Sequence, residues 1–155
     1  MKILMVCLGN ICRSPLAEGI LKQKATASGL EWDIESAGIY DFNPARPPHP
    51  LSRKVALINR IDIDKKLSRV FTRDDVNRFD KIYAMSSDVI SEIQSIAGNN
   101  YNVKKVGLLM DELFPGKDIQ VPDPICGTEP DFVSVFKLID SACEKIVEKY
   151  AAIEN

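Results

Sequence analysis

The chain has 155 residues, of which 45% are hydrophobic and 27% charged, and its formal net charge is −2. This balance is typical of a globular protein rather than a disordered one, and the length predicts one domain spanning residues 1–155. The slight negative charge argues against a nucleic-acid partner. No apolar run reaches the roughly 18 residues that a membrane span requires, so no membrane association is expected.

The four cysteines are expected to be reduced thiols of a cytoplasmic protein, because the N-terminus does not resemble a secretion signal. The protein is also expected to be a monomer. Cys7 and Cys12 are five positions apart, Cys126 and Cys143 are isolated, and His49 is the only histidine. This spacing fits no zinc site, so no metal is expected. No cofactor is expected either.

In chain order, residues 2–7 form a continuous apolar run, which is typical of a strand buried on both faces of a parallel sheet. Ser14 and Pro15 then open a helix, with Ser14 as the expected N-cap and Glu18 in the first turn. Further strands are predicted at residues 33–38, 81–85 and 105–109. Helices are predicted at residues 51–59, after residue 85 and at residues 131–150, and the last carries a strong apolar stripe.

Strands that alternate with helices predict a three-layer α/β/α domain, Rossmann-like, with a central four-stranded parallel sheet. In such folds the ligand binds at the carboxyl ends of the strands, which is where the loop after residue 7 lies.

This loop has the composition of a phosphate-binding loop that carries its own nucleophile. It reads Cys7, Leu8, Gly9, Asn10, Ile11, Cys12, Arg13 and Ser14. A tight loop that leads into a helix directs backbone amides and the positive helix end at an anion, and Gly9 gives it conformational freedom. Arg13 adds a planar fork for two phosphoryl oxygens, and this positive environment favours a nucleophilic thiolate at Cys7.

The segment from Val6 to Glu18 resembles the signature of the low-molecular-weight phosphotyrosine protein phosphatases. The similarity continues through Ser36-Ala37-Gly38, Phe71-Thr72, Phe79-Asp80, Ala84-Met85, Asp123-Pro124, Gly127 and Asp131-Phe132. The resemblance implies the phosphotyrosine phosphatase I type of fold and the hydrolysis of phosphotyrosine in proteins and of small aryl phosphates. Phosphate and other oxyanions would then bind as product or inhibitor. It also implies that Asn10 shapes the loop through side-chain hydrogen bonds, and that Ser14 donates to the Cys7 sulfur.

A phenolate leaving group predicts a general acid outside the loop, because its conjugate acid has a pKa near 10. Asp123 lies between two prolines that would stiffen its backbone, and the resemblance places the general acid at this residue. We therefore expect Cys7 to attack phosphorus, Arg13 and the loop amides to hold the phosphoryl oxygens, and Asp123 to act as acid and then as base.

The expected substrate pocket has apolar walls from Leu8, Ile11, Phe42 and Ile125. Phe42 aligns with the aromatic residue that flanks the substrate ring in the family, and Tyr40 competes for this role. Ile125 and Cys126 replace the tyrosines that many relatives carry after the acid.

Two more departures from the family are visible. Lys66 replaces a histidine that supports the loop network in many relatives, and His49 has no assigned role.

Cys12 has two open interpretations: a small residue that fills a crowded turn, or a redox partner that forms a reversible disulfide with Cys7, as in relatives that carry this cysteine.

Three other functions are alternatives to a tyrosine phosphatase. A thioredoxin-coupled arsenate reductase needs a relay of cysteines, and Cys126 and Cys143 make an unconvincing pair. Protein-arginine phosphatases generally carry Thr where this chain has Ile11. A phosphate-binding module without turnover does not explain the presence of both Cys7 and Asp123.

Overall fold

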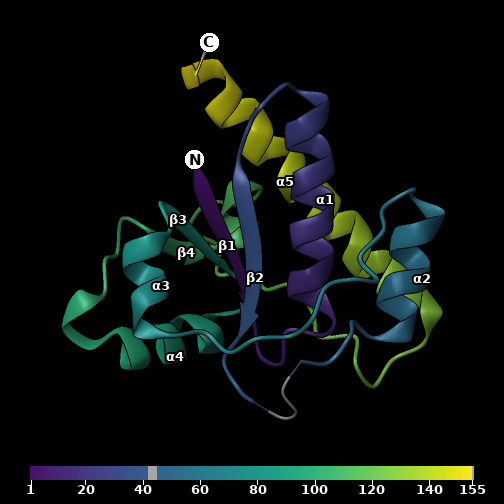
Figure 1. Ribbon diagram of the computed structural model, residues 1–155, viewed down its shortest axis with the longest axis horizontal. Coiled ribbons are helices and arrows are strands. Elements are labelled where there is room, and N and C mark those ends of the chain that lie inside the picture. The colour runs from purple at the N-terminus through teal and green to yellow at the C-terminus, as the bar shows by residue number, and fades with distance from the viewer. Residues whose placement is uncertain (42–44, 155) are drawn as a thin grey trace.

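The computed structural model describes residues 1–41 and 45–154. The strands are β1 (Lys2–Cys7), β2 (Asp33–Gly38), β3 (Lys81–Ala84) and β4 (Val106–Leu108). The helices are α1 (Arg13–Ala27), α2 (Pro50–Ile58), α3 (Arg73–Arg78), α4 (Ser87–Ala97) and α5 (Glu129–Glu154), with short 3-10 turns η1 (Gly98–Asn100) and η2 (Leu109–Glu112). Figure 1 shows their arrangement. All four predicted strands are present, and so are the four predicted helices.

The four strands form one parallel sheet in the order β2-β1-β3-β4, as expected for the fold class. After β1 the chain crosses to β2 on one side of it and later returns to β3 on the other. The loops that leave the carboxyl ends of β1 and β3 therefore diverge, which creates the crevice where open α/β sheets bind ligands. Cys7 ends β1 at this point.

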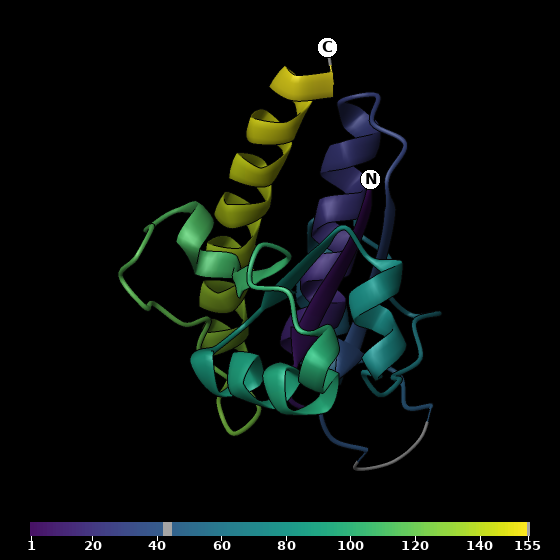
Figure 2. The ribbon, with the colours of Figure 1, turned by 90° about the vertical axis from the view of Figure 1, so that its left-hand side faces the viewer.

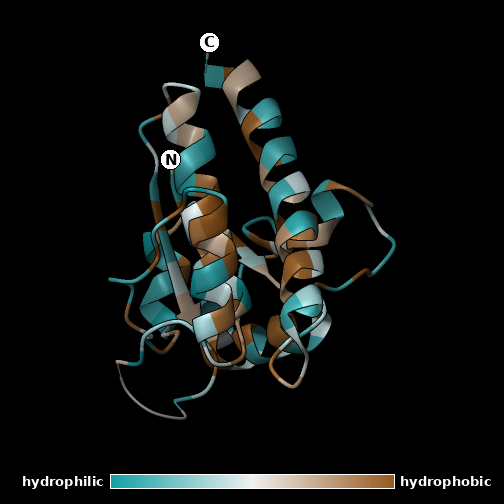
Figure 3. Cartoon of the chain, turned by 90° about the vertical axis from the view of Figure 1, so that its right-hand side faces the viewer, coloured by the Kyte–Doolittle hydropathy of each residue, from teal (hydrophilic) through white to brown (hydrophobic). Residues whose placement is uncertain are grey.

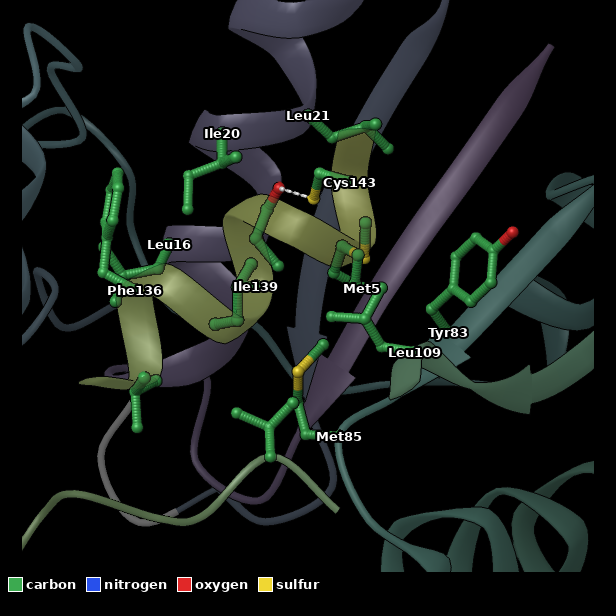
Figure 4. Packing of buried hydrophobic residues seen from close by; sticks show 14 of the residues in the cluster. Met5, Leu16, Ile20, Leu21, Tyr83, Met85, Leu109, Phe136, Ile139 and Cys143 are labelled. Carbon is green, nitrogen blue, oxygen red and sulfur yellow. Dashed lines mark hydrogen bonds between the residues drawn. The ribbon is translucent and has the colours of Figure 1, made fainter. Parts of the chain in front are cut away.

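Helices cover both faces of the sheet, as Figures 1 and 2 show from two directions. Ile3 and Met5 pack in the core formed with α1 and α5, whereas Leu4 and Val6 pack in the core on the side of α3 and α4. All four side chains are fully buried, which explains the continuous apolar run in β1. Figure 4 shows Met5 of β1 beside residues of α1 and α5, and Tyr83 of β3 next to Leu109.

The predicted apolar stripe of α5 is confirmed. Seven of its residues are buried and Tyr150 is partly buried; the seven are Phe132, Val135, Phe136, Ile139, Cys143, Ile146 and Val147. Hydrophobic and hydrophilic residues alternate along this helix in Figure 3, as in an amphipathic helix packed on one side. Within the described residues, no helix combines the length and the hydropathy needed to cross a membrane.

Two predictions about the start of α1 are wrong. The helix begins at Arg13 and its N-cap position is Cys12, so Ser14 is not the cap. Glu18 lies beyond the first turn, which contains no acidic residue. Both side chains are instead used in hydrogen bonds around the loop that precedes the helix.

The short helix α3 was not predicted from the sequence. It has six mostly polar residues and therefore lacks an apolar period. A reciprocal capping box stabilises its first turn, since the Asp75 carboxylate accepts from the Thr72 amide at 2.8 Å.

Candidate active site

The loop between β1 and α1 surrounds a pocket of about 180 Å³ at the carboxyl end of β1. Its lining residues are Cys7, Leu8, Gly9, Ile11, Cys12, Arg13, Asp123 and Ile125. The structure thus brings together three of the four residues predicted for the substrate walls. The fourth, Phe42, lies outside the described residues. The general-acid candidate, far away in sequence, lines the same pocket as the nucleophile candidate.

The sulfur of Cys7 lies 3.0 Å from the hydroxyl oxygen of Ser14. The Asn10 side-chain amide donates to that same hydroxyl at 2.8 Å, so the Ser14 proton is directed away from Asn10. The Cys7 sulfur is nearer to it than the other acceptor, the Ala37 carbonyl oxygen at 3.5 Å. The Ser14 hydroxyl can therefore donate its proton to the Cys7 sulfur.

Asn10 holds the turn of the loop in shape. It is the left-handed residue of the loop, with φ 57°, whereas Gly9 does not adopt a positive φ. Its side-chain amide also donates to the Ser36 hydroxyl at 2.9 Å, and its Oδ1 accepts from the Arg69 amide at 3.0 Å. These bonds, together with the one to Ser14, compensate for the cost of a left-handed conformation in a residue that has a Cβ atom.

Gly38 ends β2 directly beside the loop. A Cβ atom at this position would lie 2.8 Å from the carbonyl carbon of Gly9 and 2.9 Å from the amide nitrogen of Asn10. Both neighbours are backbone atoms that cannot rotate away, so the loop requires a glycine here. Gly38 belongs to the segment that resembles the family, but only the tertiary contact shows why the residue is needed.

Among the residues that the structure describes, Arg13 is the only positively charged side chain that lines the pocket, and it is 4% exposed. Its Nη1 donates to the Val121 carbonyl oxygen at 3.0 Å, and its Nη2 lies 3.4 Å from Asp123 Oδ2. Its Nε is buried without a hydrogen-bond partner among the described residues. Because buried donors are nearly always paired, an orphaned guanidinium donor beside a cysteine is typical of a site that binds an oxyanion.

Asp123 is presented by a loop that is anchored to the sheet. The Val121 amide donates to the carbonyl oxygen of Met85, just after β3, at 2.9 Å. The Asp123 side chain is 37% exposed, and its Oδ1 accepts from the Ile125 amide at 3.2 Å. Val121, which was not among the predicted site residues, fixes this loop to both the sheet and Arg13. A single valine between Gln120 and Pro122 gives no signal of that role in the sequence.

A second layer of polar residues extends behind the loop. The Ser36 hydroxyl donates to Glu18 at 2.5 Å, and Lys66 donates to the Ser36 carbonyl oxygen at 2.9 Å. Lys66 also lies 3.5 Å from Glu18, and burial lowers the pKa of its amine from the ordinary value although Glu18 opposes that shift. Lys66 therefore joins the loop network through Ser36, at the position where many relatives are expected to carry a histidine.

His49, which had no assigned role, is a structural residue. Its Nδ1 caps α2 by accepting from the Leu51 amide at 3.1 Å, and its own amide donates to the Ile11 carbonyl oxygen at 2.7 Å. Its ring stacks on Phe132 with centroids 4.8 Å apart. It connects the phosphate loop with α2 and α5.

The other cysteines have separate environments. Burial, with a smaller contribution from nearby Asp123, raises the pKa of the Cys12 thiol to about 12. Cys143 is fully buried on α5, where its thiol points at the Ala17 carbonyl oxygen (Figure 4) and burial raises its pKa. Cys126 is exposed. All four are free thiols, as expected.

Residues 2–154 match the family model described as low molecular weight phosphotyrosine protein phosphatase. The chain is 36% identical over 147 residues to the low molecular weight protein-tyrosine-phosphatase YfkJ of Bacillus subtilis, covering 94% of this chain and 92% of that protein. The crystal structure of a protein tyrosine phosphatase from Entamoeba histolytica aligns with a TM-score of 0.88 and 31% identity, covering 100% of this chain and 99% of that one. YwlE, an arginine phosphatase, aligns with a TM-score of 0.88 and 25% identity, covering 96% and 95%.

Fold and site together define a protein phosphatase built on a parallel α/β sheet. The chain belongs to the low-molecular-weight phosphotyrosine protein phosphatase family.

Proposed function

We propose that this chain hydrolyses phosphotyrosine in proteins through a phosphocysteine intermediate on Cys7. The observation that carries the proposal is the shared pocket, in which Cys7 and Asp123 flank the buried Arg13 with its unpaired Nε. A nucleophile, an oxyanion ligand and an acid in one pocket are the groups that cleavage of an aryl phosphate requires.

In the first step the Cys7 thiolate attacks phosphorus in line with the P–O bond that breaks. Arg13 and the loop amides hold the other three phosphoryl oxygens, and Asp123 gives its proton to the departing phenolate oxygen. The products are a phosphocysteine and a neutral phenol. No step requires a metal, because Arg13 and the helix end supply the positive charge.

In the second step Asp123 takes a proton from a water molecule that attacks the phosphocysteine. The P–S bond breaks, inorganic phosphate leaves, and the electron pair returns to sulfur. Ser14, 3.0 Å from the sulfur, stabilises the thiolate as it departs. The enzyme is then regenerated with Asp123 protonated.

Turnover of p-nitrophenyl phosphate and of a phosphotyrosine peptide tests the proposal. Cys7→Ser removes the sulfur nucleophile and is expected to abolish both activities, whereas Cys126→Ser, an exposed loop substitution, should preserve them. Retained turnover in Cys7→Ser would overturn the mechanism. Substrate trapping with Cys7→Ser or Asp123→Ala would identify the phosphoprotein partners.

Arginine phosphatase activity is the main competing function, since YwlE shares the fold. Ile11 lines the pocket and offers an apolar contact to a phenyl ring but no hydrogen bond to a guanidinium. A phosphotyrosine peptide and a phosphoarginine peptide should be compared directly, in the wild-type chain and in Ile11→Thr. Preference of the wild type for phosphoarginine would contradict the proposed substrate.

The arsenate reductase and the non-catalytic module are less well supported. Cys143 is buried in the α5 core and Cys126 is exposed, so they are poorly suited as successive thiols of one relay. Arsenate-dependent oxidation of thioredoxin would favour the reductase, and absent phosphatase turnover would favour the module.

Cys12 is proposed as a redox partner of Cys7, because both thiols line the same pocket. Peroxide would oxidise Cys7 to the sulfenic acid, and the Cys12 thiol would displace water to form the disulfide. Mass spectrometry after peroxide treatment should find the Cys7–Cys12 bond. If Cys7 proceeds to the sulfinic acid without it, Cys12 only fills space.

A further inference from the structure

A second pocket, of about 390 Å³, lies between α1 and the segment that follows α2. Its lining consists of Pro15, Glu18, Gly19, Lys22, Asp62, Ile63, Lys65, Lys66 and Leu67. It shares no lining residue with the pocket that contains Cys7 and is about twice its volume. None of these residues takes part in the chemical steps proposed above.

Positive charge exceeds negative charge in this pocket. Three lysines line it with two carboxylates, Glu18 and Asp62, which leaves a net charge of +1. The Lys65 amine makes no ion pair or hydrogen bond with the residues that the structure describes. One cation is therefore available to a ligand without breaking a contact within the protein.

The other two lysines share a single carboxylate. Lys22 lies 2.6 Å from Glu18 Oε1, and Lys66 lies 3.5 Å from Glu18 Oε2. Glu18 also accepts the short hydrogen bond of Ser36, so its charge is divided among three donors. Burial and the nearby charges of Arg69 and Lys22 all lower the pKa of Lys66, so an added anion would relieve an unfavourable environment.

We propose that this pocket binds a small organic polyanion, with its anionic groups on Lys22, Lys65 and Lys66 and its uncharged part against Pro15, Ile63 and Leu67. Multivalent oxyanions fit the chemistry because three ammonium groups supply up to nine N–H donors around one cavity. The apolar residues and the volume favour an organic ligand over a bare inorganic ion.

The pocket is also connected to the nucleophile. Glu18 accepts from Ser36, Ser36 accepts from Asn10, and Asn10 donates to Ser14, which contacts the Cys7 sulfur. A ligand that draws Lys22 and Lys66 away from Glu18 changes the charge around Glu18. Glu18 is the end of this series of hydrogen bonds that lies farthest from Cys7. We therefore expect the polyanion to change kcat without competing with substrate.

Citrate is a suitable probe, because it has three carboxylates and no phosphorus for Cys7 to attack. Calorimetry on the full chain, with the Cys7 pocket saturated by benzylphosphonate, should detect one citrate site. Lys65→Ala should weaken binding by about fivefold, and Lys22→Ala with Lys65→Ala by about tenfold or more. Lys104→Ala with Lys117→Ala is the matched control, since it removes the same charge from exposed positions outside the pocket.

Three results would overturn the proposal: no citrate binding when the Cys7 pocket is blocked, equal weakening by the control pair, or purely competitive inhibition. Inorganic phosphate should be titrated in parallel. Equal affinity for phosphate and citrate would contradict the assignment to an organic polyanion. Thermal unfolding of each variant separates loss of binding from loss of fold, and the phosphatase assay of unliganded protein reports on the proposed function independently.

Discussion

Arg13 Nη1 donates to the backbone carbonyl oxygen of Val121 at 3.0 Å, across 108 positions of sequence. The Val121 amide in turn donates to Met85 at the end of β3. One guanidinium thus connects the helix that follows the phosphate loop with the loop that carries Asp123. Arg13, the proposed anion ligand, and Asp123, the proposed acid, are thus both held in place by the sheet, so their spacing does not depend on a flexible connection.

Asp123→Asn should lower kcat for phosphotyrosine roughly a hundred- to ten-thousand-fold, because the phenolate would leave without a proton. The asparagine oxygen still accepts from the Ile125 amide, so the loop should keep its shape. With p-nitrophenyl phosphate, whose leaving group is much less basic, the loss should be smaller. Steady-state kinetics with both substrates test this, with the exposed Asp88→Asn as control. Equal losses on both substrates would contradict the role of proton donor.

Ser14→Ala should slow hydrolysis of the phosphocysteine more than its formation. The hydroxyl lies 3.0 Å from the Cys7 sulfur and stabilises it most when it leaves as a thiolate. Loss of one such donor costs about a hundredfold or more in the step that it serves. Rapid mixing with p-nitrophenyl phosphate should therefore reveal a burst followed by slow turnover. Ser91→Ala, on the exposed face of α4, provides the control, and a variant without a burst would place the role of Ser14 elsewhere.

Asn10→Gly and Asn10→Ala separate the two tasks of this residue. Both lose the hydrogen bonds to Ser14, Ser36 and Arg69, so both should lose activity. Only Ala must also adopt φ 57° against its Cβ atom, which costs about 1–2 kcal/mol. Urea unfolding should find Asn10→Ala less stable than Asn10→Gly by about that amount. Equal stability would mean that the loop changes conformation in one of them.

Gly38→Ala should distort the phosphate loop, because the new Cβ atom would lie 2.8 Å from the backbone of Gly9. We expect a loss of about 1–3 kcal/mol in the free energy of unfolding and weaker phosphate binding. Gly107→Ala, in β4, is the matched control, since a Cβ atom there meets nothing within 4 Å. Calorimetric titration with phosphate and thermal unfolding measure the two effects. A fully active Gly38→Ala enzyme would show that the loop tolerates displacement.

The buried Cys12 thiol should make the free energy of unfolding of the chain decrease at alkaline pH. Its pKa is about 12 in the folded chain against an ordinary value of 9.0, chiefly because the thiol is buried. The unfolded chain therefore releases this proton at lower pH than the folded chain, and stability is lost as pH rises from about 9 toward 12. Cys12→Ala lacks this loss. The stability advantage of the wild type over Cys12→Ala should shrink between pH 8 and pH 10.5, as measured by urea unfolding, and a constant difference would contradict the buried thiol.

Most of the local elements and the residues of the loop could be predicted from the sequence alone. Strand β1 is apolar on both faces and helix α5 has an apolar stripe on one face. Each hydrophobic pattern reflects which faces of the element are buried, so it can be recognised in the sequence. The segment from Cys7 to Ser14 is continuous, so its chemistry was readable without coordinates. A polar segment that is stabilised by helix capping has no hydrophobic pattern of this kind. For this reason α3 was not predicted, and Ser14 was predicted to be a helix cap.

The residues that lie opposite the loop could be identified only from the fold. The order β2-β1-β3-β4 brings the ends of β1 and β3 together, and no local pattern encodes that order. Val121 lies beside Arg13, Gly38 beneath Gly9 and Glu18 behind Ser36 because distant segments pack on one sheet. Contacts of this kind depend on shape and burial across the whole chain. The candidate nucleophile could therefore be predicted from eight consecutive residues, whereas the residues that support it could be found only from the fold.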